Sequence, residues 1–188
     1  CPFVSEEAKK ILEEASQPPV KLISIGSGDN SVSAGNETVL FRHEETFYHP
    51  ALVGIEIGDS LNDAQIDEKI KFANNFRVER VGKVLTLNII GIKNETHSDR
   101  FEKIVSDISK KTTLNLVLIS DDPDTFLRIP QVLKERRPLL CGADLNNLEK
   151  FVKIGKEFGS PVAIQAKDLD GLYFISERAR ALGFDDIV

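Results

Sequence analysis

The sequence is 188 residues long, with 41% hydrophobic residues, 29% charged residues and a formal net charge of −6. This length suits one domain with a sizeable core, and the acidic balance argues against a nucleic-acid-binding surface. No apolar run reaches the roughly 20 residues that cross a bilayer, and no signal peptide is visible. We therefore predict a cytoplasmic protein without a membrane partner.

The first residues predict a short helix followed by a stop. Ser5 is the candidate N-cap, acidic residues fill the first turn, and Pro18–Pro19 end the helix. We treat residues 1–19 as an N-terminal segment and residues 20–188 as the main domain. Because the sequence contains no Met, we also expect it to be a piece of a longer protein.

A β-hairpin is expected next. Val20–Ile25 and Thr38–Arg42 have the composition of strands, and the glycines of residues 26–30 mark a turn-rich loop after the first. These glycines do not fit a dinucleotide-binding fingerprint, because Ser31 stands where a third glycine would open a helix. Residues 41–50 combine two His, two Glu, an Arg and three aromatics. A structured loop is the favoured interpretation there, ahead of a ligand site, and a subunit contact would also suit this composition.

From residue 51 onwards, short apolar runs alternate with segments of helical spacing. Runs that are apolar on both faces need cover on both faces, which parallel strands with helical crossovers provide. The pattern therefore predicts an α/β fold with a parallel sheet. The five complete runs and the start of a sixth are Ala51–Ile57, Val84–Ile92, Leu114–Ser120, Pro138–Ala143, Pro161–Ala166 and Asp186–Val188.

The helices between these runs have recognisable start and stop signals. Pro130 lies inside the third helix and predicts a break there, and Gly159 and Gly183 are expected to end the last two helices. The predicted caps, in chain order, are Ser60, Ser98 or Asp99, Asp122 followed by Pro123, Asp144 or Asn146, and Asp168.

Polar residues follow the strands, at the edge where barrels and open α/β sheets bind ligands. Asn94, Asp121 and Asp144 are the candidate binding residues, since an acidic rim can support acid–base chemistry or bind a metal. Helix capping is nevertheless the favoured interpretation of each aspartate that follows a strand. No nucleophile motif is present, and we expect no His at a strand end. The full set of polar residues at this edge is Glu56, Asp59, Lys93, Asn94, residues 120–122, Asp144, Gln165 and Lys167.

The two cysteines suggest no disulfide framework. Cys1 and Cys141 lie far apart in a sequence without a secretory signal, which predicts reduced thiols. Cys141 stands within an apolar run, so we expect it to act as a buried small apolar residue.

Several stretches resemble a known family, the corrinoid iron–sulfur protein large subunit, which corresponds to the gamma subunit of the acetyl-CoA decarbonylase/synthase complex. The similar stretches are Cys1–Lys9, Ile25–Asn30, Gly35–Tyr48, Glu79–Gly82 and Ser120–Pro123, and the resemblance follows the whole chain in order. It implies an iron–sulfur domain, a central TIM barrel and a corrinoid-binding domain. This chain would then hold an incomplete (β/α)8 TIM barrel preceded by a helix and a β-hairpin.

The resemblance also implies how cofactors relate to this chain. Cys1 matches the last of the four ligands of a 4Fe-4S cluster, but the other three would lie upstream and the corrinoid domain downstream. We therefore expect the fragment alone to bind neither the cluster nor the cobalt-containing corrinoid. Six strands cannot close an eight-stranded barrel, so we also expect an open, curved sheet edge.

The implied function is methyl transfer in the acetyl-CoA pathway, in carbon fixation or methanogenesis. The full protein would carry a methyl group from methyltetrahydropterin or methyltetrahydrofolate to acetyl-CoA synthase. The barrel would be a scaffold that pairs with the small subunit and serves the methyltransferase and the synthase without chemistry of its own. Two alternatives stay open: a methyltransferase barrel that binds a pterin at its acidic rim, and a flavodoxin-like binding domain.

Overall fold

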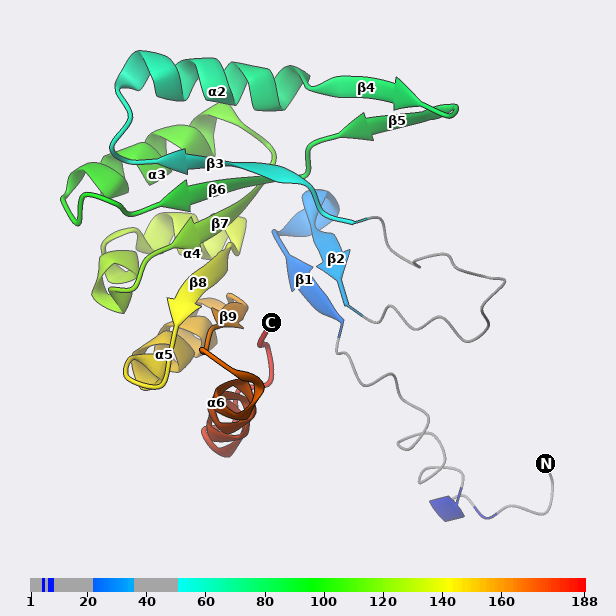
Figure 1. Cartoon of the computed structure of the whole chain (residues 1–188), viewed down its shortest axis with the longest axis vertical. Coiled ribbons are helices and arrows are strands. Elements are labelled where there is room, and N and C mark those ends of the chain that lie inside the picture. Colours follow the sequence, from blue (N-terminus) through cyan, green and yellow to red (C-terminus); the bar gives the residue numbers. More distant parts are fainter. Residues whose placement is uncertain (1–4, 6, 9–21, 36–50) are drawn as a thin grey trace.

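The computed structural model describes residue 5, residues 7–8, residues 22–35 and residues 51–188. Its main feature is a parallel five-stranded sheet with the order β3-β6-β7-β8-β9, flanked by helices (Figure 1). This confirms the predicted α/β fold with a parallel sheet. The strands are β3 Gly54–Gly58, β6 Ile89–Lys93, β7 Asn115–Ile119, β8 Leu139–Ala143 and β9 Val162–Ile164. The helices are α2 Asp63–Asn75, α3 Arg100–Lys111, the 3-10 helix η2 Pro123–Arg128, α4 Pro130–Arg136, α5 Leu148–Phe158 and α6 Leu169–Ala181.

The last apolar run continues the sheet beyond β9. Ile187 forms a parallel bridge with Val162. The Val162 N–H donates to the Asp186 carbonyl, and the Val188 N–H donates back to the Val162 carbonyl, both at 2.9 Å. The sixth run therefore occupies the strand position next to β9, as predicted.

Helix α2 begins two residues later than predicted. Its N-cap is Asn62, whose side chain accepts from the Gln65 N–H at 2.9 Å, while the Gln65 side chain accepts from the Asn62 N–H at 3.1 Å. This reciprocal capping box satisfies two otherwise unpaired N–H groups. The prediction of Ser60 as the cap was wrong, and its hydroxyl instead donates to the Glu95 carboxylate.

The predicted break at Pro130 is confirmed. Helix η2 ends at Arg128 and α4 begins at Pro130, because proline has no N–H to donate and its ring cannot follow a preceding helical turn. Gly159 ends α5 as predicted, with a φ of +66° that residues with a side chain rarely adopt.

The run Val84–Ile92 was predicted as one strand, and that was wrong. Its first part belongs to a separate antiparallel hairpin of β4 Arg77–Arg80 and β5 Lys83–Thr86, and the sheet strand β6 starts only at Ile89. Asn88 marks the return to the sheet, since its N–H donates to the Val53 carbonyl at 2.9 Å. An uninterrupted apolar run does not reveal where a chain leaves one sheet and enters another.

The described residues contain an N-terminal hairpin whose second strand was not predicted from the sequence. β1 Ile23–Ile25 pairs with β2 Val32–Ala34, and the two strands are joined through the 3-10 helix η1 Gly28–Asn30. Ser5 does cap as predicted, because its hydroxyl accepts from the Ala8 N–H at 3.2 Å. Thr38–Arg42 itself, residues 41–50, Cys1 and the boundary after residue 19 lie outside the described residues.

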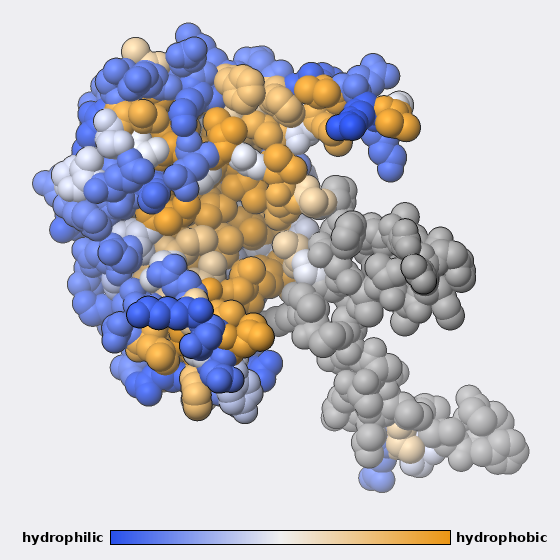
Figure 2. Space-filling model, in the orientation of Figure 1, coloured by the Kyte–Doolittle hydropathy of each residue, from blue (hydrophilic) through white to orange (hydrophobic). Residues whose placement is uncertain are grey.

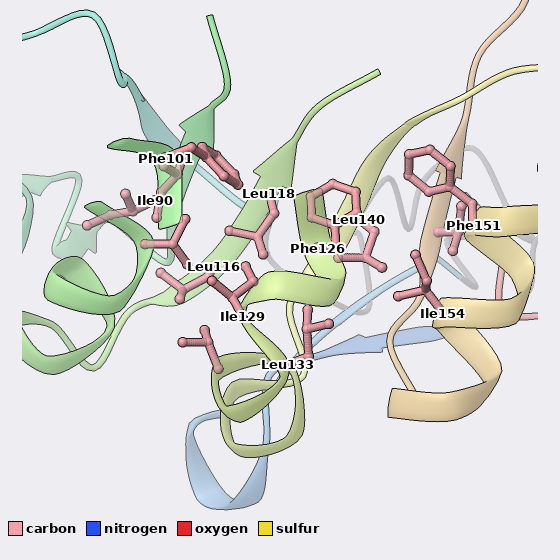
Figure 3. Packing of buried hydrophobic residues seen from close by; sticks show 14 of the residues in the cluster. Ile90, Phe101, Leu116, Leu118, Phe126, Ile129, Leu133, Leu140, Phe151 and Ile154 are labelled. Carbon is pink, nitrogen blue, oxygen red and sulfur yellow. The ribbon is translucent and has the colours of Figure 1, made fainter. Parts of the chain in front are cut away.

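The sheet buries its two faces differently. One face packs against the helices in the main core, which includes the residues labelled in Figure 3. On the other face, Ile23 and Ile25 of β1 pack against Leu139. Apolar surface stays visible in a hollow of the molecule in Figure 2. The order of the described strands never reverses, so they lack the switch point that a flavodoxin-like domain would need.

Candidate functional site

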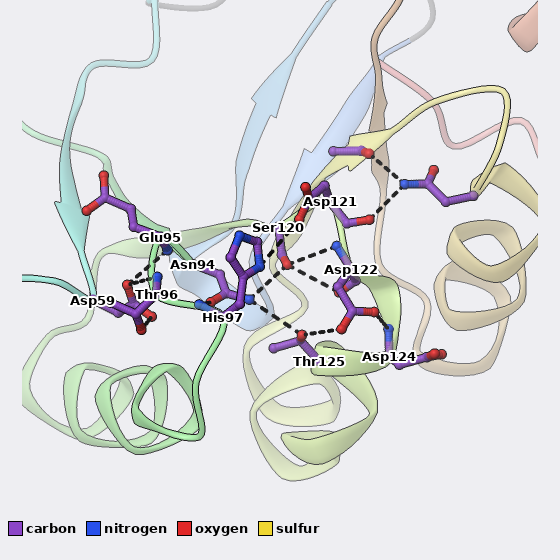
Figure 4. A network of polar contacts seen from close by, with 12 residues as sticks. Asp59, Asn94, Glu95, Thr96, His97, Ser120, Asp121, Asp122, Asp124 and Thr125 are labelled. Atoms are coloured by element: carbon purple, nitrogen blue, oxygen red, sulfur yellow. Dashed lines mark hydrogen bonds and ion pairs between the residues drawn. The ribbon is translucent and has the colours of Figure 1, made fainter.

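A cavity of about 480 Å³ lies at the carboxyl ends of the sheet strands. It is lined by Lys93, Asn94, Glu95, His97, Ile119, Ser120, Asp121, Cys141, Gly142 and Gln165. Two of the three candidate residues, Asn94 and Asp121, therefore line one cavity, whereas Asp144 is outside its lining. Figure 4 shows the polar network around this cavity.

Asn94 is buried, and hydrogen bonds engage both ends of its side-chain amide. The amide N–H donates to the Ser120 hydroxyl at 3.1 Å and, at 3.5 Å, faces the Thr125 hydroxyl. The amide oxygen accepts from the His97 N–H at 3.0 Å. Asn94 thus ties the loop after β6 to the loop after β7, which leaves its side chain little capacity for a ligand.

Asp121 faces His97 across the mouth of the cavity. The Asp121 carboxylate lies 3.7 Å from His97 Nδ1, and both side chains are well exposed to solvent. An imidazole beside a carboxylate is a combination used in acid–base chemistry, so this exposed pair is the feature of the cavity to test for a functional role.

His97 corrects the expectation that no His lies at a strand end. It comes four residues after the last residue of β6, in a loop that turns back over the cavity. Its φ of +50° is uncommon for a residue with a side chain and is held by the Asn94 hydrogen bond. The sequence signal was the polar stretch of residues 94–98, but only the folded loop brings its fourth residue back to the strand ends.

Asp59 does not cap a helix, in contrast to its predicted role. Its side chain is fully buried and accepts from the N–H groups of Glu95 and Thr96, each at 2.9 Å, and from the Thr96 hydroxyl at 2.7 Å. Asp59 at the end of β3 therefore holds the loop that carries His97. The buried Asp59 carboxylate accepts three hydrogen bonds from the loop after β6, so it fixes that loop and not the start of α2.

Two other aspartates at this edge, Asp122 and Asp168, do cap the helices that follow them, as predicted. Asp122 accepts from the Asp124 N–H at 3.1 Å, and Asp168 accepts from the Gly171 N–H at 2.8 Å. The prediction of Asp144 or Asn146 as the cap of α5 was wrong, because the N-cap is Asn147. Asp144 instead accepts from the N–H groups of Asn146 and Asn147, at 2.8 and 3.1 Å, in the loop before the helix. These carboxylates shape the loops before helices.

Lys93 brings a cation to the rim of the cavity. Its ammonium lies 3.9 Å from the Glu56 carboxylate and 3.6 Å from the Glu95 carboxylate. All three side chains are partly exposed, so these ion pairs add little to stability. Of the remaining predicted rim residues, Gln165 lines the cavity, whereas Lys167 is exposed outside the lining.

Cys141 lines the floor of the cavity as a protonated thiol. Burial raises its pKa to about 11, because the thiolate loses contact with water. It follows that Cys141 is neither a nucleophile nor a ready metal ligand at neutral pH, which agrees with its predicted role as a small apolar residue. The adjacent Gly142 has a φ of +122°, and a side chain there would collide with the Ser120 carbonyl.

The thiol of Cys141 should react slowly with alkylating reagents. In a Cys1→Ser variant, where Cys141 is the sole cysteine, we expect alkylation near pH 8 to run about 100-fold slower than for a thiol of ordinary pKa. Stability should also fall between about pH 9 and pH 11, because the unfolded chain releases this proton first. Iodoacetamide labelling followed by mass spectrometry measures the rate, and the same chain unfolded in urea is the control. Equal rates in the folded and unfolded chain would contradict the buried position.

Within the described part of the chain, no group of three or more His, Cys, Asp or Glu side chains could hold a metal ion. The whole sequence contains two cysteines, fewer than the four thiolates of a 4Fe-4S cluster. No helix among residues 22–35 and 51–188 is long and apolar enough to cross a membrane.

Comparison with known proteins gives a consistent set of relatives. Residues 22–188 match the family described as CO dehydrogenase/acetyl-CoA synthase delta subunit. The corrinoid/iron-sulfur protein large subunit of Moorella thermoacetica is 33% identical over the whole chain, which covers 42% of that relative. The acetyl-CoA decarbonylase/synthase complex subunit gamma of Methanopyrus kandleri is 32% identical over 92% of the chain and 37% of the relative. The corresponding subunit of Methanothermobacter thermautotrophicus is 30% identical over the whole chain and 41% of the relative. The chain thus spans about two fifths of the length of these relatives.

Proposed function

The chain belongs to the CO dehydrogenase/acetyl-CoA synthase delta subunit family, and from this premise we propose that it is the scaffold barrel of a corrinoid iron–sulfur protein. The full protein would carry methyl groups from methyltetrahydropterin or methyltetrahydrofolate to acetyl-CoA synthase. The names of the relatives, a corrinoid/iron-sulfur protein large subunit and gamma subunits of the decarbonylase/synthase complex, support this assignment. The small subunit, the methyltransferase and acetyl-CoA synthase are the proposed partners.

The barrel part of the proposal rests on how the sheet is wound. The strands follow one another in sequence order, each connection returns to a parallel neighbour, and one face carries the helices. Repetition of this unit is the winding of a (β/α)8 barrel, and the last run already continues the sheet past β9. We propose that further strands, supplied from outside these residues, complete the barrel.

The observation that carries the scaffold role is the state of the polar groups at the strand ends. Asn94, Asp59 and Asp144 are committed to hydrogen bonds that hold the loops, and Cys141 is a buried thiol. Such groups position loops and do not react. In this proposal the cluster and the corrinoid belong to other parts of the full protein, and Cys1 is the fourth cluster ligand.

A pterin-binding methyltransferase barrel is the second candidate, because Asp121 and His97 keep exposed polar atoms at the mouth of the cavity. A pterin ring needs hydrogen-bonding partners at such an edge, and these two side chains could supply them.

Titration of the chain with methyltetrahydrofolate and with methyltetrahydropterin separates the two candidates. The scaffold proposal predicts no saturable heat signal in calorimetry, together with co-purification of the small subunit on a tagged chain. Binding that Asp121→Ala abolishes would establish the pterin site instead. Asp99→Ala is the matched control, since its carboxylate is exposed and lies outside the cavity lining.

A further inference from the structure

The hairpin of β4 and β5 projects from the body of the molecule (Figure 1). All eight residues of its two strands are exposed, and each strand pairs with the other and with no further strand among the described residues. Val78, Val84 and Leu85 have between 43% and 50% of their surface exposed. An isolated two-stranded hairpin is only marginally stable in water, so an ordered one with exposed apolar side chains indicates a missing contact.

The charged side chains of this hairpin make no hydrogen bond or ion pair within the described part of the chain. These residues are Arg77, Arg80, Lys83 and Glu79. The other six arginines among the described residues each donate at least one hydrogen bond from the guanidinium; they are Arg100, Arg128, Arg136, Arg137, Arg178 and Arg180. The hairpin thus holds three free cations and one free anion in a chain of net charge −6.

The register places these groups so that one side of the hairpin is apolar and basic. Val78 lies opposite Leu85, and Arg80 lies opposite Lys83, on the same face because they are two positions apart along each strand. An apolar pair near the base is therefore followed by a basic pair near the tip.

The turn of the hairpin carries an apolar residue in an unfavourable conformation. Val81 has a φ of +50° and 96% of its surface exposed, and Gly82 follows with a φ of +72°. Two-residue turns of this kind favour Asn-Gly, and a β-branched residue at such a φ is an outlier. Nothing in the described chain contacts Val81 to compensate, which points to a contact outside the chain.

We propose that the hairpin of residues 77–86 docks onto a carboxylate-rich surface with an apolar centre on a different protein subunit. Carboxylates would pair with Arg80 and Lys83, while an apolar recess would receive Val81 and the Val78–Leu85 pair. The inference goes beyond the proposed function, because it assigns a particular surface and a partner chemistry. It rests on that proposal only in expecting a partner subunit.

Two other binding partners for the hairpin, an anionic membrane and a second copy of the chain, agree less well with its residues. Anionic membranes attract hairpins that carry aromatic residues and many basic ones, whereas this hairpin has no aromatic residue and the chain is acidic overall. Two copies that met through the same face would bring Arg80 and Lys83 of both together. A hairpin bound elsewhere on a second copy would form a head-to-tail contact that extends into chains.

Site-specific photo-crosslinking in the complex isolated from cells tests the proposal. The full-length protein carries p-benzoylphenylalanine in place of Val81, and a second version carries it in place of Leu169, an equally apolar residue that is 82% exposed on α6. We expect position 81 to crosslink to an acidic peptide of a different subunit, identified by mass spectrometry. A crosslink to lipid or to a second copy, or none while the complex is intact, would overturn the inference. If no subunit co-purifies with the unaltered protein, the proposed function fails as well.

Charge-reversal variants measure how much the basic residues of the hairpin contribute to binding of the subunit. Arg80→Glu combined with Lys83→Glu should weaken co-purification of the crosslinked subunit by about tenfold or more, with less sensitivity to salt. Lys71→Glu combined with Lys153→Glu reverses two exposed lysines on helices and should change nothing. Val81→Asn should weaken docking without lowering the melting temperature, since Asn accepts this backbone conformation. Full retention of the subunit in the hairpin double variant would refute the charge argument.

Discussion

Replacing Phe151 with alanine is expected to lower the free energy of unfolding by about 4 kcal/mol, the loss typical of a large aromatic side chain removed from a closed core. Phe151 on α5 is fully buried and meets the ring of Phe126, also fully buried, edge to face at a centroid distance of 5.6 Å. These rings join α5 to η2 over the sheet, so the cavity left behind could not close by movement of one side chain (Figure 3). Urea unfolding followed by circular dichroism measures the loss.

Phe174→Ala is the matched control for this prediction. Phe174 lies on α6 with 63% of its surface exposed and contacts the ring of Tyr173, so its removal should change the free energy of unfolding by about 0.5 kcal/mol or less. Similar losses for the two alanine variants would mean that the contact of α5 with the sheet is not the main core.

Asp59→Ala should cost about 3 kcal/mol of unfolding free energy, because it leaves two N–H groups and one hydroxyl without their shared acceptor. These donors belong to Glu95 and Thr96, in the loop that carries His97 (Figure 4). The loss should therefore be accompanied by faster hydrogen exchange of the Glu95 and Thr96 amides. Chemical denaturation gives the first quantity, and exchange followed by NMR gives the second.

Asp99→Ala provides the comparison for the buried aspartate. The Asp99 carboxylate is 92% exposed and pairs with Arg128 at 2.8 Å, so its removal should cost less than about 1 kcal/mol. If Asp59→Ala left both stability and amide exchange unchanged, Asp59 would not be the residue that holds this loop.

The Phe151 and Asp59 predictions concern two kinds of contact that stabilise the domain, one in the apolar core and one at the strand ends. The apolar contacts between helices and sheet fix the strands, and the polar contacts at the strand ends then fix the loops. Groups that hold loops in this way are unavailable for chemistry unless the loop moves. This is the physical basis of the proposed scaffold role.

Features that depend on local sequence were well predicted. The alternation of apolar runs and helical segments anticipated all five sheet strands, because a strand buried on both faces must be apolar along its length. Pro130 and Gly159 marked a helix break and a helix end for reasons contained in their own backbones. Asp168 was identified as a cap because the bond it makes is to a residue three positions away.

The predictions that failed concern partners distant in sequence. Asp59 looks like a cap because aspartate often precedes a helix, yet its donors lie 36 and 37 residues further along the chain. His97 was missed because its position depends on a loop that Asn94 and Asp59 bend back over the cavity. The β4–β5 hairpin was hidden inside an apolar run that also contains β6.

The sequence by itself determined the class of fold, the positions of the sheet strands along the chain and the family, since each depends on a periodicity or on a match along the chain. Only the tertiary structure decided which polar groups are bound, which are exposed and which lie side by side. Asp59 and Asp121 are the same residue type at the ends of two strands, yet one is buried with three donors and the other faces His97 in solvent. The difference arises from the loops that cover them, because burial and hydrogen-bonding partners, and not residue type, determine what a carboxylate can do.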